Sequence, residues 1–411
     1  MKDTVFSSAD ILIPLFSNDK DKMEKWSVIA CDQFTSEEEY WKKCRDIIGE
    51  SPSTLDYILP EVYIGSDREN EMLSYIKQHC DKFNEGEMRL IKGMIYVKRR
   101  LPNGKIRRGI IGKLDLERYD YNKGSTSPIR ATEETIISRI PSRGKIRAFS
   151  KIELPHILIL VSDKTLFDTA EGEAHDKLYD FELMQGGGHI EGYSIEEKGD
   201  SLARFSDAIE KYEKSHDGDV MYAVGDGNHS LAAAKAHWEK LKENGADENH
   251  PARYALCELT PLDDDSLEFE PIYRLLKNCD TKKFMKELHA ITAHDNNLSQ
   301  KITVVTKDGK EELAFISAAH PLTQGTLQKF IDEYIERNPE TECDYIHGTE
   351  ALEKLAGGEN CVGFIFDGID KSELFDYIKK YGTLPRKTFS MGEAESKRYY
   401  LEARNIKETL I

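Results

Sequence analysis

The sequence lacks long apolar runs, and no stretch reaches the length of a membrane-spanning helix. Its start, MKDTVFSSAD, also lacks the basic and then apolar pattern of a signal peptide. We therefore expect a cytoplasmic protein with no membrane partner. Cysteine is scarce as well, with 7 scattered residues in 411 and no CxxC pair. This pattern argues against a disulfide framework and against a structural zinc site.

Basic residues are fewer than acidic residues. The 57 Lys and Arg residues are outnumbered by 75 Asp and Glu residues, which gives a net charge of −18. Such acidity disfavours binding to nucleic acid. The sequence also lacks the GKS or GKT ending of a Walker loop, a GxGxxG after a strand, and any HxxxH or HExxH spacing. It therefore gives no sign of zinc, haem or flavin as a cofactor.

Strand, hairpin and helix signals are mixed along a chain that is 39% hydrophobic and 32% charged. Asn103-Gly104 between two apolar-rich runs predicts a hairpin over residues 94–116. The run LPHILILV at 154–161 predicts a strand that is buried on both faces. Together these signals predict an α/β (α+β) fold with a mixed sheet.

Shifts in composition divide the chain weakly into three parts. We expect an N-terminal part at 1–125, a core at 126–280 and a C-terminal part at 281–411. In the last part, Ser390 followed by Glu393 fits a capping box and predicts a terminal helix.

The most informative stretch is Val220–Ala236, VMYAVGDGNHSLAAAKA. It predicts a buried strand, a tight polar turn, and a helix that begins on the turn. A strand that delivers polar side chains to a helix N-terminus forms a natural anion pocket. Ordinary capping would need only one oxygen, whereas Asp226, Asn228, His229 and Ser230 crowd this turn. We therefore favour an anion site here over a simple cap.

A second candidate is the glycine run at 185–189, QGGGH. Gly187 and Gly188 allow close approach of the backbone to a ligand, and consecutive N–H groups form anion nests. His189 would then contact the same anion. A flexible loop with His189 in solvent is the equally weighted alternative.

Two further positions fit phosphate chemistry. Arg130 is suited to holding a phosphate, and Glu133 to accepting a proton from a substrate hydroxyl. The alternative is a purely structural role, as a helix start with acidic residues in its first turn. Asp32 lies next to Cys31 between a short strand and a helix, and is a second candidate base.

Six segments resemble, in order, the bacterial and archaeal domain of unknown function 1015 proteins. They are ACDQFTSEEEYW, YDFELMQGGGHIEGY, AVGDGNHSLAAAKAHWE, HPARYALCEL, LEFEPIYRLL and LPRKTFSMGEAESKRYYLEAR. The resemblance covers nearly the whole chain but supplies no established activity.

The central turn of that family is similar to a turn in ParB partition proteins, sulfiredoxin and free-serine kinases. This wider resemblance implies a ParB/sulfiredoxin-like core with additional N- and C-terminal elements. It also implies that ATP or ADP with Mg²⁺ lies on the turn formed by Asp226, Gly227, Asn228, His229 and Ser230, with Asp226 holding the metal.

Ser230 departs from the wider set, which has an arginine at this place. An arginine would neutralise phosphate charge through two hydrogen bonds, and a serine does not. Another cation must substitute, and the candidates are Arg130, Arg274 and Lys235.

We expect a nucleotide-dependent phosphotransferase that acts on a small hydroxyl-bearing metabolite. His229 would donate to the phosphates, Glu133 or Asp32 would accept the proton of the acceptor, and Asp226 would hold Mg²⁺ or fix the turn. Two alternatives stay open. One is a nucleotide-binding or nucleotide-hydrolysing switch protein, and a homodimer is an expected assembly of the chain. The other is a degenerate protein that binds an anion or a metabolite without catalysis.

Overall fold

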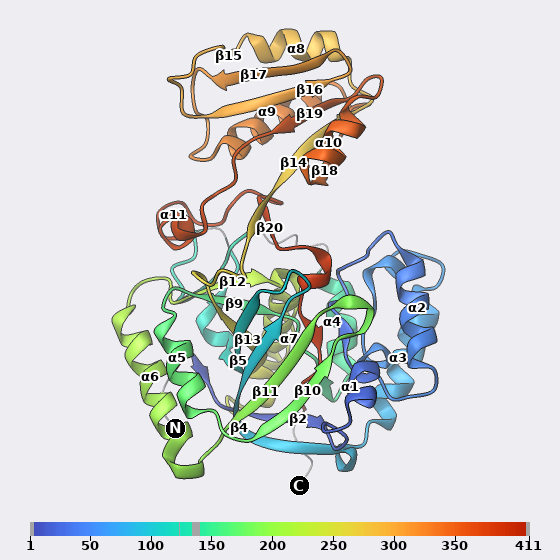
Figure 1. Ribbon diagram of the computed structural model, residues 1–411, viewed down its shortest axis with the longest axis vertical. Helices are drawn as coiled ribbons and strands as arrows, with labels where there is room; N and C mark the ends of the chain where they lie inside the picture. The colour runs from blue at the N-terminus through green and yellow to red at the C-terminus, as the bar shows by residue number, and fades with distance from the viewer. Residues whose placement is uncertain (1–3, 123, 134–139, 408–411) are drawn as a thin grey trace. The chain divides into compact units, whose positions relative to one another are not determined.

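The computed structural model describes residues 4–122, 124–133 and 140–407, and the chain forms two compact units (Figure 1). The first unit contains Met1–Leu267, Phe375–Thr383 and Glu393–Ile411, and the second contains Glu268–Leu374 and Leu384–Gly392. The boundary expected near residue 125 falls inside the first unit. The division into three parts stays a prediction.

A large mixed sheet organises the first unit. Its strands follow the order β10-β11-β4-β5-β13-β9-β12-β7-β6, with β1 added to β5 and β2 added to β4. The pairs β13–β9, β12–β7 and β6–β7 are parallel, and the others are antiparallel. The α/β class with a mixed sheet is therefore confirmed. The strands are β1 (Phe6–Ser7), β2 (Ala9–Pro14), β4 (Met88–Arg100), β5 (Ile106–Asp115), β6 (Tyr119–Asp120), β7 (Ile129–Ala131), β9 (Leu158–Val161), β10 (Lys177–Glu182), β11 (His189–Ile195), β12 (Tyr222–Asp226) and β13 (Tyr254–Pro261).

Helices cover this sheet, and their apolar residues join two separate cores, one on each face. The helices of the first unit are α1 (Lys20–Trp26), α2 (Glu38–Ile48), α3 (Glu69–Lys82), α4 (Ile140–Phe149), α5 (Thr165–Glu173), α6 (Ser201–Ser215) and α7 (Asn228–Glu243), with α11 (Leu374–Tyr381) from its second residue on. No helix in the described ranges is long and apolar enough to cross a membrane.

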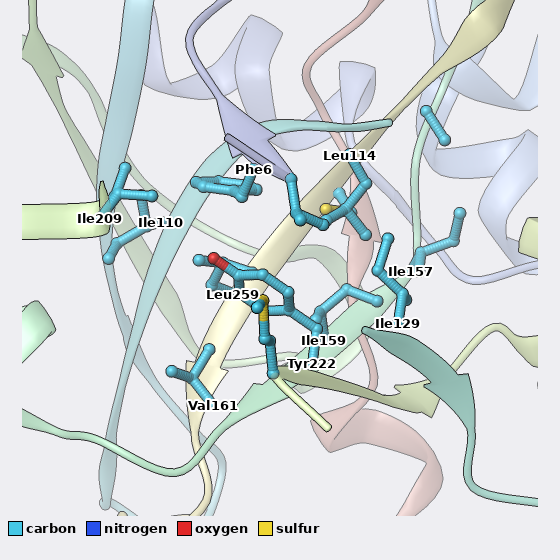
Figure 2. Close-up of a cluster of buried hydrophobic side chains, with 14 of the residues drawn as sticks. Phe6, Ile110, Leu114, Ile129, Ile157, Ile159, Val161, Ile209, Tyr222 and Leu259 are labelled. Carbon is cyan, nitrogen blue, oxygen red and sulfur yellow. The ribbon is translucent and has the colours of Figure 1, made fainter. Parts of the chain in front are cut away.

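The two cores follow from the alternation of side chains along each strand. Ile110 belongs to the core that contains side chains of α5, α6 and α7, whereas its neighbour Ile111 belongs to the core that contains side chains of α1 and α2. On β13, Cys257 belongs to the first of these cores and its neighbour Leu256 belongs to the second. Figure 2 shows part of the first core, where Phe6 and Tyr222 lie among aliphatic side chains of the central strands. β13 and β9 are therefore buried on both faces, which confirms the prediction made for β9 from its continuous apolar run.

The second unit has its own sheet, in the order β15-β17-β16-β19-β14-β18, with β20 paired to β14. Its strands are β14 (Phe269–Lys277), β15 (Thr292–Ala293), β16 (Lys301–Thr306), β17 (Gly309–Phe315), β18 (Glu342–His347), β19 (Val362–Ile365) and β20 (Phe389–Met391). Its helices are α8 (Thr281–His289), α9 (Thr323–Arg337) and α10 (Thr349–Ala356). Leu275, Phe284, Leu327 and Phe364 belong to one core between these layers.

The terminal helix predicted from Ser390 and Glu393 is wrong. Ser390 lies inside β20, and the chain goes on into β21 (Tyr399–Tyr400) and β22 (Arg404–Asn405). β21 pairs with β3 (Val28–Ile29), and β22 pairs with β8 (Ile152–Glu153). Pairing with distant strands overrides the local capping pattern. The C-terminal segment is thereby drawn into the first unit, beside the polar turn after β12.

Candidate functional site

The polar turn, residues 226–230, connects β12 to α7. Gly227 has a φ of +79° and precedes the first helical residue, Asn228. A Cβ atom on Gly227 would lie 3.0 Å from the Cα atom of Ile157, so the turn needs glycine for both space and conformation. The amides of Ser230 and Leu231 donate to the carbonyl of Gly227 at 3.0 Å. The earlier amides of α7 belong to its N-terminus, where anions bind favourably.

Asp226 is held by this chain on both carboxylate oxygens. Its Oδ1 accepts the Gly227 N–H at 2.9 Å, and its Oδ2 lies 3.3 Å from Lys397 Nζ. Lys397 is only 7% exposed, so its ammonium is fixed beside the turn. These contacts fit the turn-fixing alternative for Asp226. Its role as a Mg²⁺ ligand stays a prediction.

Three further buried cations lie near Lys397, and with it they form what we call the basic cluster: Arg99, Arg107, Lys397 and Arg398. Arg398 is neutralised, because its Nε lies 2.8 Å from Glu258 and its Nη2 lies 2.6 Å from Glu402. Gly109 makes this possible, since a Cβ there would lie 2.2 Å from Glu258 Oε1.

Arg99 and Arg107 donate to carbonyl oxygens, whose charge is only partial. Arg99 donates to Gly187 O at 2.9 Å, and Arg107 donates to Ser396 O at 2.8 Å. Their Nε atoms are buried and have no hydrogen-bond partner within the described residues. Burial, and then repulsion from Arg107, lowers the pKa of Arg99 to about 9. Burial also lowers the pKa of Arg107, although the charges of Glu258 and Asp226 oppose this. The cluster therefore carries positive charge that an anion would stabilise.

A hydrogen-bonded network centred on His156 lies at Ser230, the last residue of the polar turn. His156 Nε2 is 3.2 Å from Ser230 Oγ and 3.6 Å from Asp32 Oδ2, and its Nδ1 is 2.8 Å from the Tyr400 hydroxyl. That hydroxyl also contacts Cys31 Sγ at 3.1 Å. His156 is only 4% exposed. The network therefore connects a buried imidazole to the first turn of α7.

A cavity of roughly 130 Å³ opens beside this network. Cys31, His156, Ser230 and Tyr400 lie on its wall, together with Ala233 of α7. The rest of the wall is largely apolar, and includes Ile58, Leu59, Ile64, Ile146, Ile152, Leu154, Ile157 and Leu256.

The structure brings several of the predicted site residues together. Asp32 and Ser230 meet at His156. Glu133 follows β7, which runs parallel to β12 with Ala131 opposite Val224, so it emerges at the same edge of the sheet as Asp226. His229 is half-buried in the first turn of α7. Their catalytic roles stay predictions, and the residues after Glu133, 134–139, lie outside the described ranges.

The glycine run forms the hairpin turn between β10 and β11, and its close approaches are to this chain itself. A Cβ on Gly187 would lie 2.3 Å from the Tyr399 hydroxyl, and one on Gly188 would lie 2.0 Å from a backbone oxygen of the same unit. His189 lies 3.1 Å from Asp180 and 2.9 Å from a second carboxylate on β10. Packing therefore accounts for these glycines, and phosphate binding by them stays a prediction.

The three cations predicted to replace the missing arginine have partners within the chain, and phosphate binding by them stays a prediction. Arg130 donates to Ser127 O at 2.9 Å, and Lys235 lies 2.6 Å from Glu239. Arg274 is fully buried in the second unit, where it donates to one side-chain oxygen and three backbone carbonyls. Lys397 lies beside the turn, with its Nζ 3.3 Å from Asp226.

Within the described residues, one group of three side chains could hold a metal ion: Asp180, His189 and Glu191. Lys177 already lies 2.7 Å from Asp180 and 2.9 Å from Glu191. This group is on the β10–β11 hairpin and does not include Asp226.

The sequence did not reveal His156, Tyr400, Lys397, Arg99 or Arg107. His156 and Tyr400 are separated by 244 positions, and Arg99 and Lys397 by 298. The available signals were a lone histidine inside a buried apolar run, and a Lys-Arg pair next to two tyrosines. Neither pattern is specific without the fold.

The family model described as protein of unknown function (DUF1015) matches residues 13–334. The curated proteins contain no match to the sequence. Among solved structures, a free serine kinase in complex with AMP is 14% identical, with a TM-score of 0.39, covering 72% of this chain and 90% of that one.

A conserved hypothetical protein from Pyrococcus furiosus is 13% identical, with a TM-score of 0.36 and coverage of 72% and 94% of the two chains. SbnI with a C-terminal truncation, from Staphylococcus aureus, is 10% identical, with a TM-score of 0.38 and coverage of 69% and 82%. Likenesses at this level do not indicate which ligand this chain binds.

Proposed function

This chain belongs to the family of proteins of unknown function numbered 1015, and we propose that it binds the phosphates of a nucleotide at the polar turn. We further propose that it transfers a phosphoryl group to a small hydroxyl-bearing metabolite. One observation carries this proposal: buried positive charge from Lys397 and Arg107 adjoins Asp226, at the N-terminus of α7.

The electrostatics of the turn favour a phosphate. Amides at a helix N-terminus donate to anions, and the helix dipole adds a favourable field. Lys397 supplies an ammonium beside the turn, and Arg99 and Arg107 supply charge that carbonyl oxygens only partly offset. This charge takes the place of the arginine that Ser230 replaces.

Phosphoryl transfer needs positioning and charge neutralisation more than covalent chemistry. His156 lies 3.2 Å from Ser230 Oγ and 3.6 Å from Asp32 Oδ2, so a group able to accept a proton adjoins the proposed phosphate position. A nucleotide brings its own Mg²⁺ on the phosphates. Both oxygens of Asp226 already contact groups of this chain.

The proposal is tested by thermal unfolding with ATP, ADP and pyrophosphate, each with and without Mg²⁺. At a ligand concentration 100 times the dissociation constant, binding adds about 2.7 kcal/mol to the free energy of unfolding. Lys397→Met should weaken nucleotide binding at least tenfold, and His229→Ala should also weaken it. Lys198→Met is the matched control, because Lys198 pairs with Asp176 at 3.2 Å on the exposed surface.

Lys397→Met leaves the carboxylate of Asp226 without its ammonium, so the variant could lose binding through a disordered turn. Asp226→Asn combined with Lys397→Met removes both charges and should recover most of the lost stability. If this stable double variant binds nucleotide as tightly as wild type, the assignment of the phosphates to the turn is wrong.

A further inference from the structure

We propose that the cavity beside Ser230 is the acceptor pocket, and that it takes a small uncharged alcohol with an apolar body. Ser230 and His156 would together remove the proton of that alcohol. This inference rests on the proposed function, because the phosphoryl donor is the nucleotide on the polar turn.

The size of the cavity limits the acceptor. Its volume is roughly 130 Å³. An apolar cavity of about 150 Å³ accommodates benzene, a molecule of six carbon atoms. The pocket therefore suits a molecule of about six non-hydrogen atoms.

The walls select an uncharged, apolar body. Most of the lining side chains are aliphatic, and among them are Leu59, Leu154 and Ile157. Arg147, Glu153 and Glu61 also line the cavity. Glu153 Oε2 lies 2.5 Å from Arg147 Nη1, and Glu153 Oε1 lies 2.6 Å from Arg404 Nη2, so the charges of this group already have partners within the chain. Along the aliphatic remainder of the wall, a charged ligand would lose its hydration without gaining an equal partner.

The polar end of the pocket holds His156 between Tyr400 and Ser230. The Tyr400 hydroxyl contacts Cys31 Sγ at 3.1 Å and accepts from Cys31 N at 3.3 Å. It also lies 2.8 Å from His156 Nδ1, and in the proposed relay Nδ1 carries the hydrogen. His156 Nε2 is then the basic nitrogen and accepts from Ser230 Oγ. Asp32 Oδ2, 3.6 Å from Nε2, stabilises the imidazolium that forms.

Ser230 connects the pocket to the phosphates, because it lies both in the first turn of α7 and on the cavity wall. The acceptor hydroxyl gives its proton to Ser230 Oγ as the Ser230 proton passes to His156 Nε2. The acceptor oxygen forms a bond to the terminal phosphorus of the nucleotide. The bond from that phosphorus to its bridging oxygen breaks, and the shortened nucleotide leaves with the electron pair. A serine at position 230 thus serves a relay that an arginine would not provide.

Cyclopentanol, with six non-hydrogen atoms, is the probe for the pocket. Saturation-transfer NMR should detect it on the full-length wild-type protein. Ala233→Leu fills the cavity and should reduce the signal at least tenfold. Ala236→Leu, on the same helix and half-buried, should leave both the signal and the melting temperature unchanged. An undiminished signal in Ala233→Leu, or no signal in wild type, would overturn the pocket assignment.

The relay is tested by following transfer from ATP to cyclopentanol with phosphorus NMR. Ser230→Ala and His156→Gln should each slow the appearance of the phosphate monoester by about 10²–10⁴-fold. Ser230→Thr keeps the hydroxyl and should restore most of the rate. If Ser230→Ala is as fast as Ser230→Thr, there is no relay.

An ADP titration of wild type separates the two proposals. If the wild-type protein binds cyclopentanol but not ADP, the proposed function is refuted and the assignment of the pocket is not. ADP binding without cyclopentanol binding would refute only the pocket.

Discussion

Gly227 sets the direction in which α7 leaves β12. Its φ of +79° is unfavourable for other residues, and its neighbour Ile157 leaves little room for a Cβ. Gly227→Ala should therefore lower the free energy of unfolding by about 1–3 kcal/mol. Gly172→Ala is the contrast, because Gly172 lies in α5 with nothing within 4 Å of its added Cβ. It should raise stability by about 0.5–1 kcal/mol.

Urea unfolding of the two variants gives this comparison directly. Equal stabilities for Gly227→Ala and Gly172→Ala would show that the turn tolerates a side chain. The geometry assigned to the polar turn would then need revision.

Individual residues show where sequence reasoning stops. Asp226 and Ser230 were predicted as site residues because they crowd one turn, and the structure places both beside buried polar groups. The identity of those groups could not be read from the chain. Lys397 is 171 positions after Asp226, and long-range pairings such as that of β21 with β3 bring its segment beside the turn.

At the scale of elements, short-range signals predicted structure well. Asn103-Gly104 gave the β4–β5 hairpin, and Val220–Ala236 gave β12, the turn and α7. In both cases, the residues that form the pattern are next in the chain to the elements that they connect. The capping pattern at Ser390 failed because β20 pairs with β14, more than a hundred positions earlier. The local preference of a few residues for a helix start is outweighed by strand pairing with a distant segment.

Helix α7 carries a pH-sensitive residue, His237. Burial, and then repulsion from Arg147, lowers the pKa of His237 to about 4. An unfolded histidine titrates near pH 6.5, so the unfolded chain binds more protons than the folded chain between those two values. Stability should therefore fall as the pH is lowered from 7 to 5. The side chain is partly exposed, so we expect a loss of only about 1 kcal/mol.

Chemical unfolding of wild type and His237→Gln at pH 8, 7, 6 and 5 measures this loss. The stability difference between the two proteins at pH 8 is the reference. That difference should shift by about 1 kcal/mol in favour of His237→Gln at pH 5. A difference that does not change with pH would contradict the assignment.

At the scale of the whole molecule, the site is assembled from distant segments. Five parts of the chain come together in the first unit: Asp32, Arg107, His156, the polar turn and residues 396–402. The net charge of −18 gave no hint of this basic cluster, since a total charge hides local balance. Composition could therefore exclude classes of partner, but could not place the ligand.

Hydrogen exchange with and without ADP tests where the ligand acts. Amides of residues 226–230 and of 396–402 should exchange more slowly when ADP is bound, because phosphate contacts stabilise both segments. Amides of α9, in the core of the second unit, provide the internal reference. Slower exchange in α9 without a change at 226–230 would contradict a phosphate site on the turn.

The most direct measurement is a crystal structure of the protein with ADP. Phosphate oxygens should lie within about 3 Å of the first amides of α7 and of Lys397 Nζ. Ser230 Oγ should lie between the terminal phosphate and the cavity. Phosphates bound on another surface, such as the β10–β11 hairpin, would contradict a phosphate site on the polar turn.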